Sequence, residues 1–130
     1  MLPLPIAVWH ECVAKNDLTS FLELVADDAV FQSPAIHTPQ VGKAKVEMYL
    51  RGAFAVLNTP GFRYVDEWIK PGSAILEFEG NIGGMALNGI DLMRWNDEER
   101  VTGFKVMVRP FKGLTALMGE MQKLLETQAK

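Results

Sequence analysis

The stretch that decides the fold covers residues 85–109 and reads MALNGIDLMRW (85–95), NDEER (96–100) and VTGFKVMVR (101–109). Two long β-prone segments flank a short charged segment, which is typical of an antiparallel hairpin. Strand side chains alternate between two faces, so Leu87, Asp91 and Met93 share one face. A carboxylate among large apolar side chains is costly unless it is paired or protonated. Asp91 is therefore the candidate catalytic residue.

The composition indicates an ordinary globular domain. The chain has 130 residues, of which 48% are hydrophobic and 22% charged, and we expect one domain over residues 1–130. The net charge of −3 argues against a nucleic-acid partner, which needs a basic face. Cys12 is the only cysteine, so an intrachain disulfide is excluded. No His, Asp and Glu residues have the spacing of a metal site, and we expect no metal.

The N-terminal segment does not resemble a targeting signal. Residues 1–5 lack a basic start and contain two prolines, unlike a signal peptide. No run approaches the roughly 18 apolar residues of a membrane span. We therefore expect a cytoplasmic protein without a membrane partner.

The first half of the chain has helical periodicity. Apolar residues recur at helical spacing from Pro5, from Leu18 and from Lys43, which predicts three helices. We expect the second helix to end at Asp27 and Asp28. A short strand over residues 29–33 and a loop over residues 34–42 should precede the third helix.

The second half alternates with the period of strands. We expect strands over residues 62–69 and 74–80, then the hairpin, then a helix after Pro110. Helices followed by an antiparallel meander indicate an α+β fold. Glycines at 80, 83, 84, 89 and 103 suit a strongly curved sheet. A curved sheet wrapped on the three N-terminal helices leaves a conical cavity.

Three stretches carry a family resemblance: N16-D-L…A26-D-D-A-V-F-Q-S-P34, G42-K…V46…Y49-L50, and G89-I-D-L-M-R-W95. Their order and spacing resemble the nuclear transport factor 2-like superfamily, which has a cone-shaped, cystatin-like fold. The superfamily includes ketosteroid isomerases and the polyketide cyclases called SnoaL-like. The resemblance implies three N-terminal helices packed on a curved antiparallel sheet, and a C-terminal helix.

The resemblance to ketosteroid isomerase is partial at the site. Asp91 matches that family's protonated acid, which donates a hydrogen bond to the substrate oxyanion. The family's general-base aspartate falls on Ser33, and a serine hydroxyl is too weak a base without a helper. Its oxyanion-hole tyrosine falls on Trp9, whose indole N–H only donates. We therefore expect no classical steroid isomerase activity. SnoaL-like cyclases, thought to use a single acid/base aspartate at the Asp91 position, match better.

The candidate pocket residues come from the helices and strands that should face the cavity. They are Trp9, His10, Val13, Phe31, Ser33, Tyr49, Phe54, Leu87, Met93, Phe104, Val106 and Val108. Tyr64 and Trp68 are further aromatic candidates, although most side chains of such apolar stripes form ordinary core. A lone histidine such as His10 is more often a core or rim residue than a catalytic one.

Two functions are compatible with these residues. The first is an isomerase- or cyclase-type step in which Asp91 protonates or hydrogen-bonds the oxygen of a small lipophilic carbonyl compound, without a cofactor. The second is a non-catalytic dimeric module that binds a small apolar ligand or a protein partner.

The outer face of the hairpin favours a homodimer. Ile90, Leu92 and Met107 lie there beside Arg94, Lys105 and Arg109, and exposed apolar patches of this kind often mark interfaces. The final helix offers a competing explanation, because it could cover the same patch.

Overall fold

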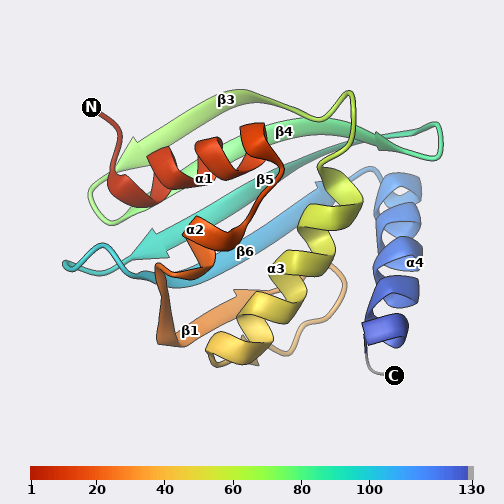
Figure 1. Cartoon of the computed structure of the whole chain (residues 1–130). Helices are drawn as coiled ribbons and strands as arrows, with labels where there is room; N and C mark the ends of the chain where they lie inside the picture. Colours follow the sequence, from red (N-terminus) through yellow and green to blue (C-terminus); the bar gives the residue numbers. More distant parts are fainter. Residues whose placement is uncertain (129–130) are drawn as a thin grey trace.

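The computed structural model describes residues 1–128 and has the predicted α+β architecture (Figure 1). The elements are, in chain order, α1 (Leu4–Lys15), α2 (Thr19–Leu22), β1 (Val25–Gln32), β2 (Gln40–Val41), α3 (Lys43–Leu57), β3 (Arg63–Lys70), β4 (Ser73–Ile82), β5 (Met85–Trp95), β6 (Val101–Arg109) and α4 (Phe111–Gln128). Within the described residues, no helix is long and apolar enough to span a membrane.

The six strands form one curved sheet in the order β2-β1-β6-β5-β4-β3. The meander from β3 to β6 is antiparallel, as predicted. The predicted antiparallel sheet has one parallel pairing, between β1 and β6. The sequence-distant pairing of β1 with β6 is a tertiary contact that no local pattern encodes.

The second predicted helix is much shorter than its apolar stripe. Leu18, Phe21, Leu22 and Val25 are all buried, as a helical stripe would require, but α2 ends at Leu22. Val25 is buried as the first residue of β1, and the exposed Asp27 and Asp28 lie in that strand. Val25 and Ala29 are buried and the two aspartates between them are exposed. This spacing of four residues also suits a helix, so the sequence predicts a longer helix than the structure has.

The N-terminal helices cover one face of the sheet, which we call the inner face (Figure 1). Trp9 of α1 and Phe21 of α2 both pack against Phe104 of β6, and Tyr49 of α3 stacks on Phe31 of β1. The hydrophobic core therefore lies between these helices and the sheet.

Helix α4 packs beside α3 rather than on the outer face. A Cβ at Gly52 of α3 would lie only 3.5 Å from Met121 Cε of α4, and Leu117 and Met121 are buried. On the outer face, Met107 remains 48% exposed. The helix is therefore not the cover of the outer face.

Candidate functional site

Asp91 points from the middle of β5 into the space beneath the helices. It pairs with Leu76 of β4 and Val106 of β6, both buried, and is itself only 5% exposed. Two residues earlier, a Cβ at Gly89 would lie 2.6 Å from Phe78 Cζ, so the missing side chain makes room for that ring. The strand therefore places one carboxyl group on an otherwise apolar face.

A small cavity lies in front of Asp91. Its walls come from α1, α3, the β3 region and β6, and are mainly apolar. They consist of Trp9, Val13, Leu50, Ala53, Phe54, Leu57, Asn58, Phe62, Tyr64, Asp91, Phe104 and Val106. The free volume is about 30 Å³, room for roughly two water molecules.

A directed chain of hydrogen bonds holds the carboxyl group. The Trp9 indole N–H donates to the Tyr64 hydroxyl oxygen over 2.7 Å, and the Tyr64 O–H donates to Asp91 Oδ2 over 2.6 Å. An indole N–H can only donate. Because the indole N–H donates to the phenol oxygen, the phenol proton is left to donate to Asp91. All donors in this series of hydrogen bonds therefore point toward Asp91.

Burial makes Asp91 a weak acid. Desolvation raises the pKa of Asp91 from its ordinary value of 3.8 to about 7, although the hydrogen bond from Tyr64 lowers it. Burial, and then the charge of Asp91, hold the pKa of Tyr64 well above its ordinary value. Asp91 therefore exchanges a proton near neutral pH, while Tyr64 stays a neutral phenol.

The second carboxyl oxygen, Oδ1, is free to meet a ligand. Within residues 1–128, Oδ1 has no hydrogen-bond partner. Every fully buried side-chain oxygen or nitrogen in these residues has a partner, so Oδ1 is not fully buried. Oδ1 is therefore accessible, and the surface that Asp91 offers lies in the cavity. Because Oδ2 accepts from Tyr64, the proton of neutral Asp91 belongs on Oδ1, where it can be donated to a ligand oxygen.

The structure divides the predicted pocket residues into two groups. Asp91, Trp9, Val13, Phe54, Phe104 and Val106 line the cavity. His10, Phe31, Ser33, Tyr49, Leu87, Met93 and Val108 lie outside it.

Stacked rings separate Ser33 and Tyr49, two members of the second group, from Asp91. Phe31 is stacked between Tyr49 and Phe104, so these rings fill the middle of the predicted cone. Ser33 and Tyr49 line another groove, beside Met118 and Met121 of α4. Ser33 Oγ accepts a hydrogen bond from the Ala35 N–H. Leu87 and Met93 are buried core residues.

His10 lies behind the site rather than in it. Its Nε2 pairs with Glu67 Oε1 of β3, and its ring meets the Tyr64 ring edge-on. The pair ties α1 to the outermost strand next to Tyr64. It thereby helps to keep Trp9, the neighbour of His10, within reach of the phenol.

The sequence named Tyr64 only as a further aromatic candidate for the cavity and gave it no part in holding Asp91. The aromatic residue on a predicted strand was a signal, but only the packing of α1 on β3 brings its hydroxyl to Asp91. Leu50, Ala53 and Leu57 belong to the predicted stripe of the third helix. Asn58 and Phe62 lie at element ends, where periodicity carries no information.

The model of the SnoaL-like domain family matches residues 6–104. This chain belongs to the SnoaL-like domain family. No protein of curated function matches the sequence significantly.

Solved structures agree with this membership. A steroid delta-isomerase from Pseudomonas aeruginosa is 37% identical to this SnoaL-like domain, with a TM-score of 0.91 over 96% of this chain and 91% of that one. An uncharacterised protein with a cystatin-like fold from Silicibacter pomeroyi is 29% identical, with a TM-score of 0.89 over 98% and 89%. The epoxide hydrolase/cyclase-like enzyme SalBIII, which acts in salinomycin pyran ring formation, shares the fold at 12% identity, with a TM-score of 0.65 over 84% and 90%.

Proposed function

We propose that this SnoaL-like domain binds a small lipophilic carbonyl compound and that Asp91 acts on the carbonyl oxygen as a neutral acid. The observation that carries the proposal is the setting of Asp91: Tyr64 occupies Oδ2, Oδ1 has no hydrogen-bond partner within residues 1–128, and Asp91 lines an apolar cavity. A donor aimed at developing negative charge in a dry site is a large catalytic term.

The chemistry is of the isomerase or cyclase type. When a bond shift or ring closure places negative charge on the carbonyl oxygen, Asp91 Oδ1 donates its hydrogen bond, or transfers its proton, to that oxygen. In the case of full transfer, the O–H bond to Asp91 breaks and the substrate O–H bond forms. Asp91 is left as a carboxylate and regains a proton from solvent. These steps need Asp91 neutral, and its pKa of about 7 supplies that form below neutral pH.

The similarity to a steroid delta-isomerase makes a steroid ketone one candidate ligand. Against it, Trp9 and Ser33 stand where the ketosteroid isomerase resemblance needs a tyrosine and an aspartate. Ser33 lines a groove that is separate from the Asp91 cavity. We therefore expect no turnover of a Δ5-3-ketosteroid above background, and an absorbance assay for the conjugated product tests this. Turnover typical of a dedicated isomerase would contradict our residue assignment.

Binding of 3,4-dinitrophenol, which is ionised at neutral pH and imitates an enolate oxygen, tests the acid role of Asp91. Affinity should fall as pH rises through about 7, because ionised Asp91 repels the phenolate. In Asp91→Asn the amide N–H still donates, so affinity should lose this pH dependence. Wild-type binding that does not change between pH 5.5 and pH 8.5 would contradict the proposal.

A specific observation also favours the non-catalytic alternative. Asp91 is the only carboxyl group among the described residues that line the cavity, so the wall offers no second acid or base. Proton exchange at the α-carbon of a small bound ketone in deuterated water separates the two functions. Exchange that Asp91→Asn abolishes supports catalysis, and binding without any exchange supports the binding module.

A further inference from the structure

The cavity in front of Asp91 is too small for the ligand that the proposed function requires. Its free volume is about 30 Å³, whereas pockets for small organic molecules span roughly 300–1,000 Å³. A carbonyl compound larger than a few atoms therefore reaches Asp91 Oδ1 only if part of the wall moves. The moving part should separate the cavity from a space already open to solvent.

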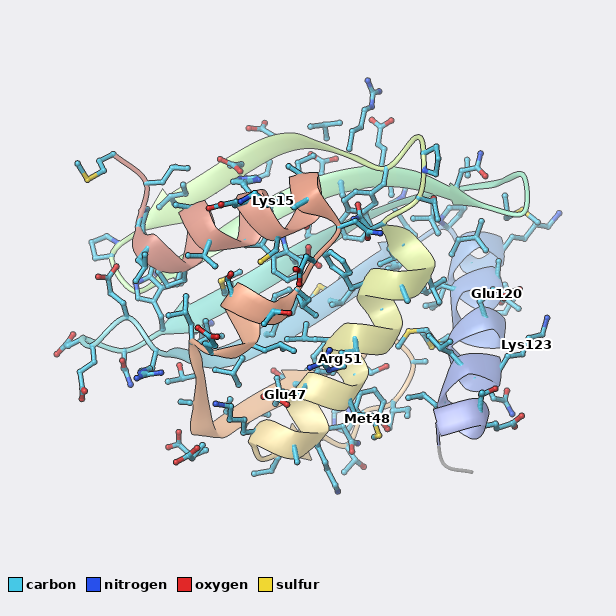
Figure 2. All side chains as sticks on the ribbon, viewed as in Figure 1. Lys15, Glu47, Met48, Arg51, Glu120 and Lys123 are labelled. Carbon is cyan, nitrogen blue, oxygen red and sulfur yellow. The ribbon has the colours of Figure 1, made fainter. Side chains whose placement is uncertain are left out.

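One stretch of wall meets this condition. An open groove of about 540 Å³ runs between the α1–α2 connection and α3, and is lined by Asn16, Asp17, Leu18, Thr19, Arg51, Phe54, Ala55, Asn58 and Leu124. Arg51 projects from α3 toward α2 at this groove (Figure 2). Phe54 and Asn58 line both the groove and the Asp91 cavity, so these two side chains form the partition.

Hydrogen bonds from Asn58 hold the partition shut. Its Nδ2 donates to Val13 O over 3.1 Å and to Asn16 Oδ1 over 3.0 Å, which joins the end of α3 to the end of α1. Asn16 has a positive φ of 53°, a conformation that asparagine tolerates better than most residues. It directs its side chain toward Asn58. Phe54 fills the space beside this bridge and meets the Trp9 ring edge-on at 6.1 Å.

The opposite side of the cavity is closed by packed rings instead. The groove that contains Ser33 and Tyr49 shares no lining residue with the Asp91 cavity. Phe31 and Phe104, both buried, are stacked between the two spaces. Opening that side would require the core to unpack. Opening the Asn58 side requires two hydrogen bonds at helix ends to break and one ring to rotate.

We infer that Asn58 and Phe54 form the gate through which the ligand enters the Asp91 cavity from the groove between α1–α2 and α3. The inference rests on the proposed function, since it takes Asp91 as the group that the ligand meets. The gate selects narrow, flat molecules that insert the carbonyl oxygen first, while a larger body remains in the groove. Asn58 and Phe54 are thus specificity-determining residues, and neither takes part in proton transfer.

Stopped-flow binding of 3,4-dinitrophenol at pH 6 tests the gate. Asn58→Ala removes both bridging bonds, and we expect its association rate to exceed that of the wild type by about tenfold, since a hydrogen bond is worth about that factor. Phe54→Leu keeps the bridge and shortens the partition, so its association should also be faster. Asn88→Ala is the matched control: Asn88 Nδ2 likewise makes two hydrogen bonds, to Glu77 Oε2 and Phe78 O, but Asn88 does not line the cavity. Its association rate should equal that of the wild type, and thermal melts check that all variants are folded.

The outcomes distinguish the gate from the function on which it rests. If the wild type binds with the expected pH dependence but Asn58→Ala and Phe54→Leu associate no faster, the gate is wrong and the proposed function stands. If the two gate variants bind faster but Asp91→Asn and pH change nothing, the gate stands and the role of Asp91 fails. Binding by none of the proteins overturns both.

Discussion

The two faces of the β5–β6 hairpin are made by alternate residues of the same strands, yet the inner face is covered by helices and the outer face is partly exposed. On the inner face, Asp91 lies between buried Leu76 and Val106 and beneath the helices. On the outer face, Ile90 pairs with Met107, and Leu92 with Lys105, and Met107 remains 48% exposed. The comparison shows that strand alternation selects the face of a residue, while the covering helices decide whether a carboxyl group there becomes a neutral acid.

The largest expected effect concerns the inner face and pH. The pKa of Asp91 is raised from 3.8 to about 7 in the folded protein, so the native state holds a proton that the unfolded state releases. This contribution to stability is complete below about pH 4 and is lost as pH rises through about 7. Between pH 5 and pH 7 the free energy of unfolding should fall by roughly 2 kcal/mol on account of Asp91.

Asp91→Asn isolates that effect, because the amide cannot ionise and still accepts from Tyr64. In urea melts we expect the variant to keep its fold, to lose this slope with pH, and to be more stable than the wild type at pH 8. A loss of several kcal/mol at pH 8 would instead show that ionised Asp91 is a structural partner of a cation.

The second effect breaks the hydrogen-bond chain behind Asp91. Tyr64→Phe removes the donor to Asp91 Oδ2 and leaves the buried Trp9 N–H without its acceptor, which costs about 1–3 kcal/mol. It also removes the bond that lowers the pKa of Asp91, so that pKa should rise. Carboxyl ¹³C NMR measures the pKa of Asp91. An unchanged or lower pKa would contradict the hydrogen bond from Tyr64 to Asp91. Phe62→Leu, at a neighbouring ring of the same wall, is the packing control.

The third effect belongs to the outer face, where we propose a homodimer. Trp68, 54% exposed, continues the row of Ile75, Leu92 and Lys105 across the sheet, so the apolar surface extends over several strands. Light scattering at micromolar concentration should give a mass about twice the 14.5 kDa of one chain. Leu92→Lys should reduce the measured mass to that of one chain. A wild-type mass near 14.5 kDa would reject the dimer.

The smallest effect is expected at Ser33, which the ketosteroid isomerase resemblance puts at the general-base position. Its hydroxyl accepts a hydrogen bond from the Ala35 N–H and lies outside the Asp91 cavity. Ser33→Ala should change stability by less than about 1 kcal/mol and leave 3,4-dinitrophenol affinity within about twofold. A large loss of affinity would show that the groove containing Ser33 joins the Asp91 cavity when a ligand binds.

The sequence by itself determined the α+β class, the inward direction of Asp91 and the order of the elements other than β2, which lies in the predicted loop over residues 34–42. These follow from local periodicity, because strand alternation assigns Asp91 and Leu87 to one face and helical spacing assigns Val46 and Leu50 to another element's buried stripe. The same local information misjudged α2, since one turn of helix followed by a strand buries the same residues as a longer helix.

Only the tertiary structure decided the chemistry around Asp91. Tyr64 and Trp9 are 55 residues apart, and their hydroxyl and indole groups meet because α1 packs on β3, a contact with no local signature. The stacking of Phe31 on Phe104 likewise separates Ser33 from Asp91, although Ser33 directly follows β1, a strand of the same sheet as β5. Hydrogen-bond direction, desolvation and ring packing depend on distances across the fold, and periodicity along the chain reports none of these.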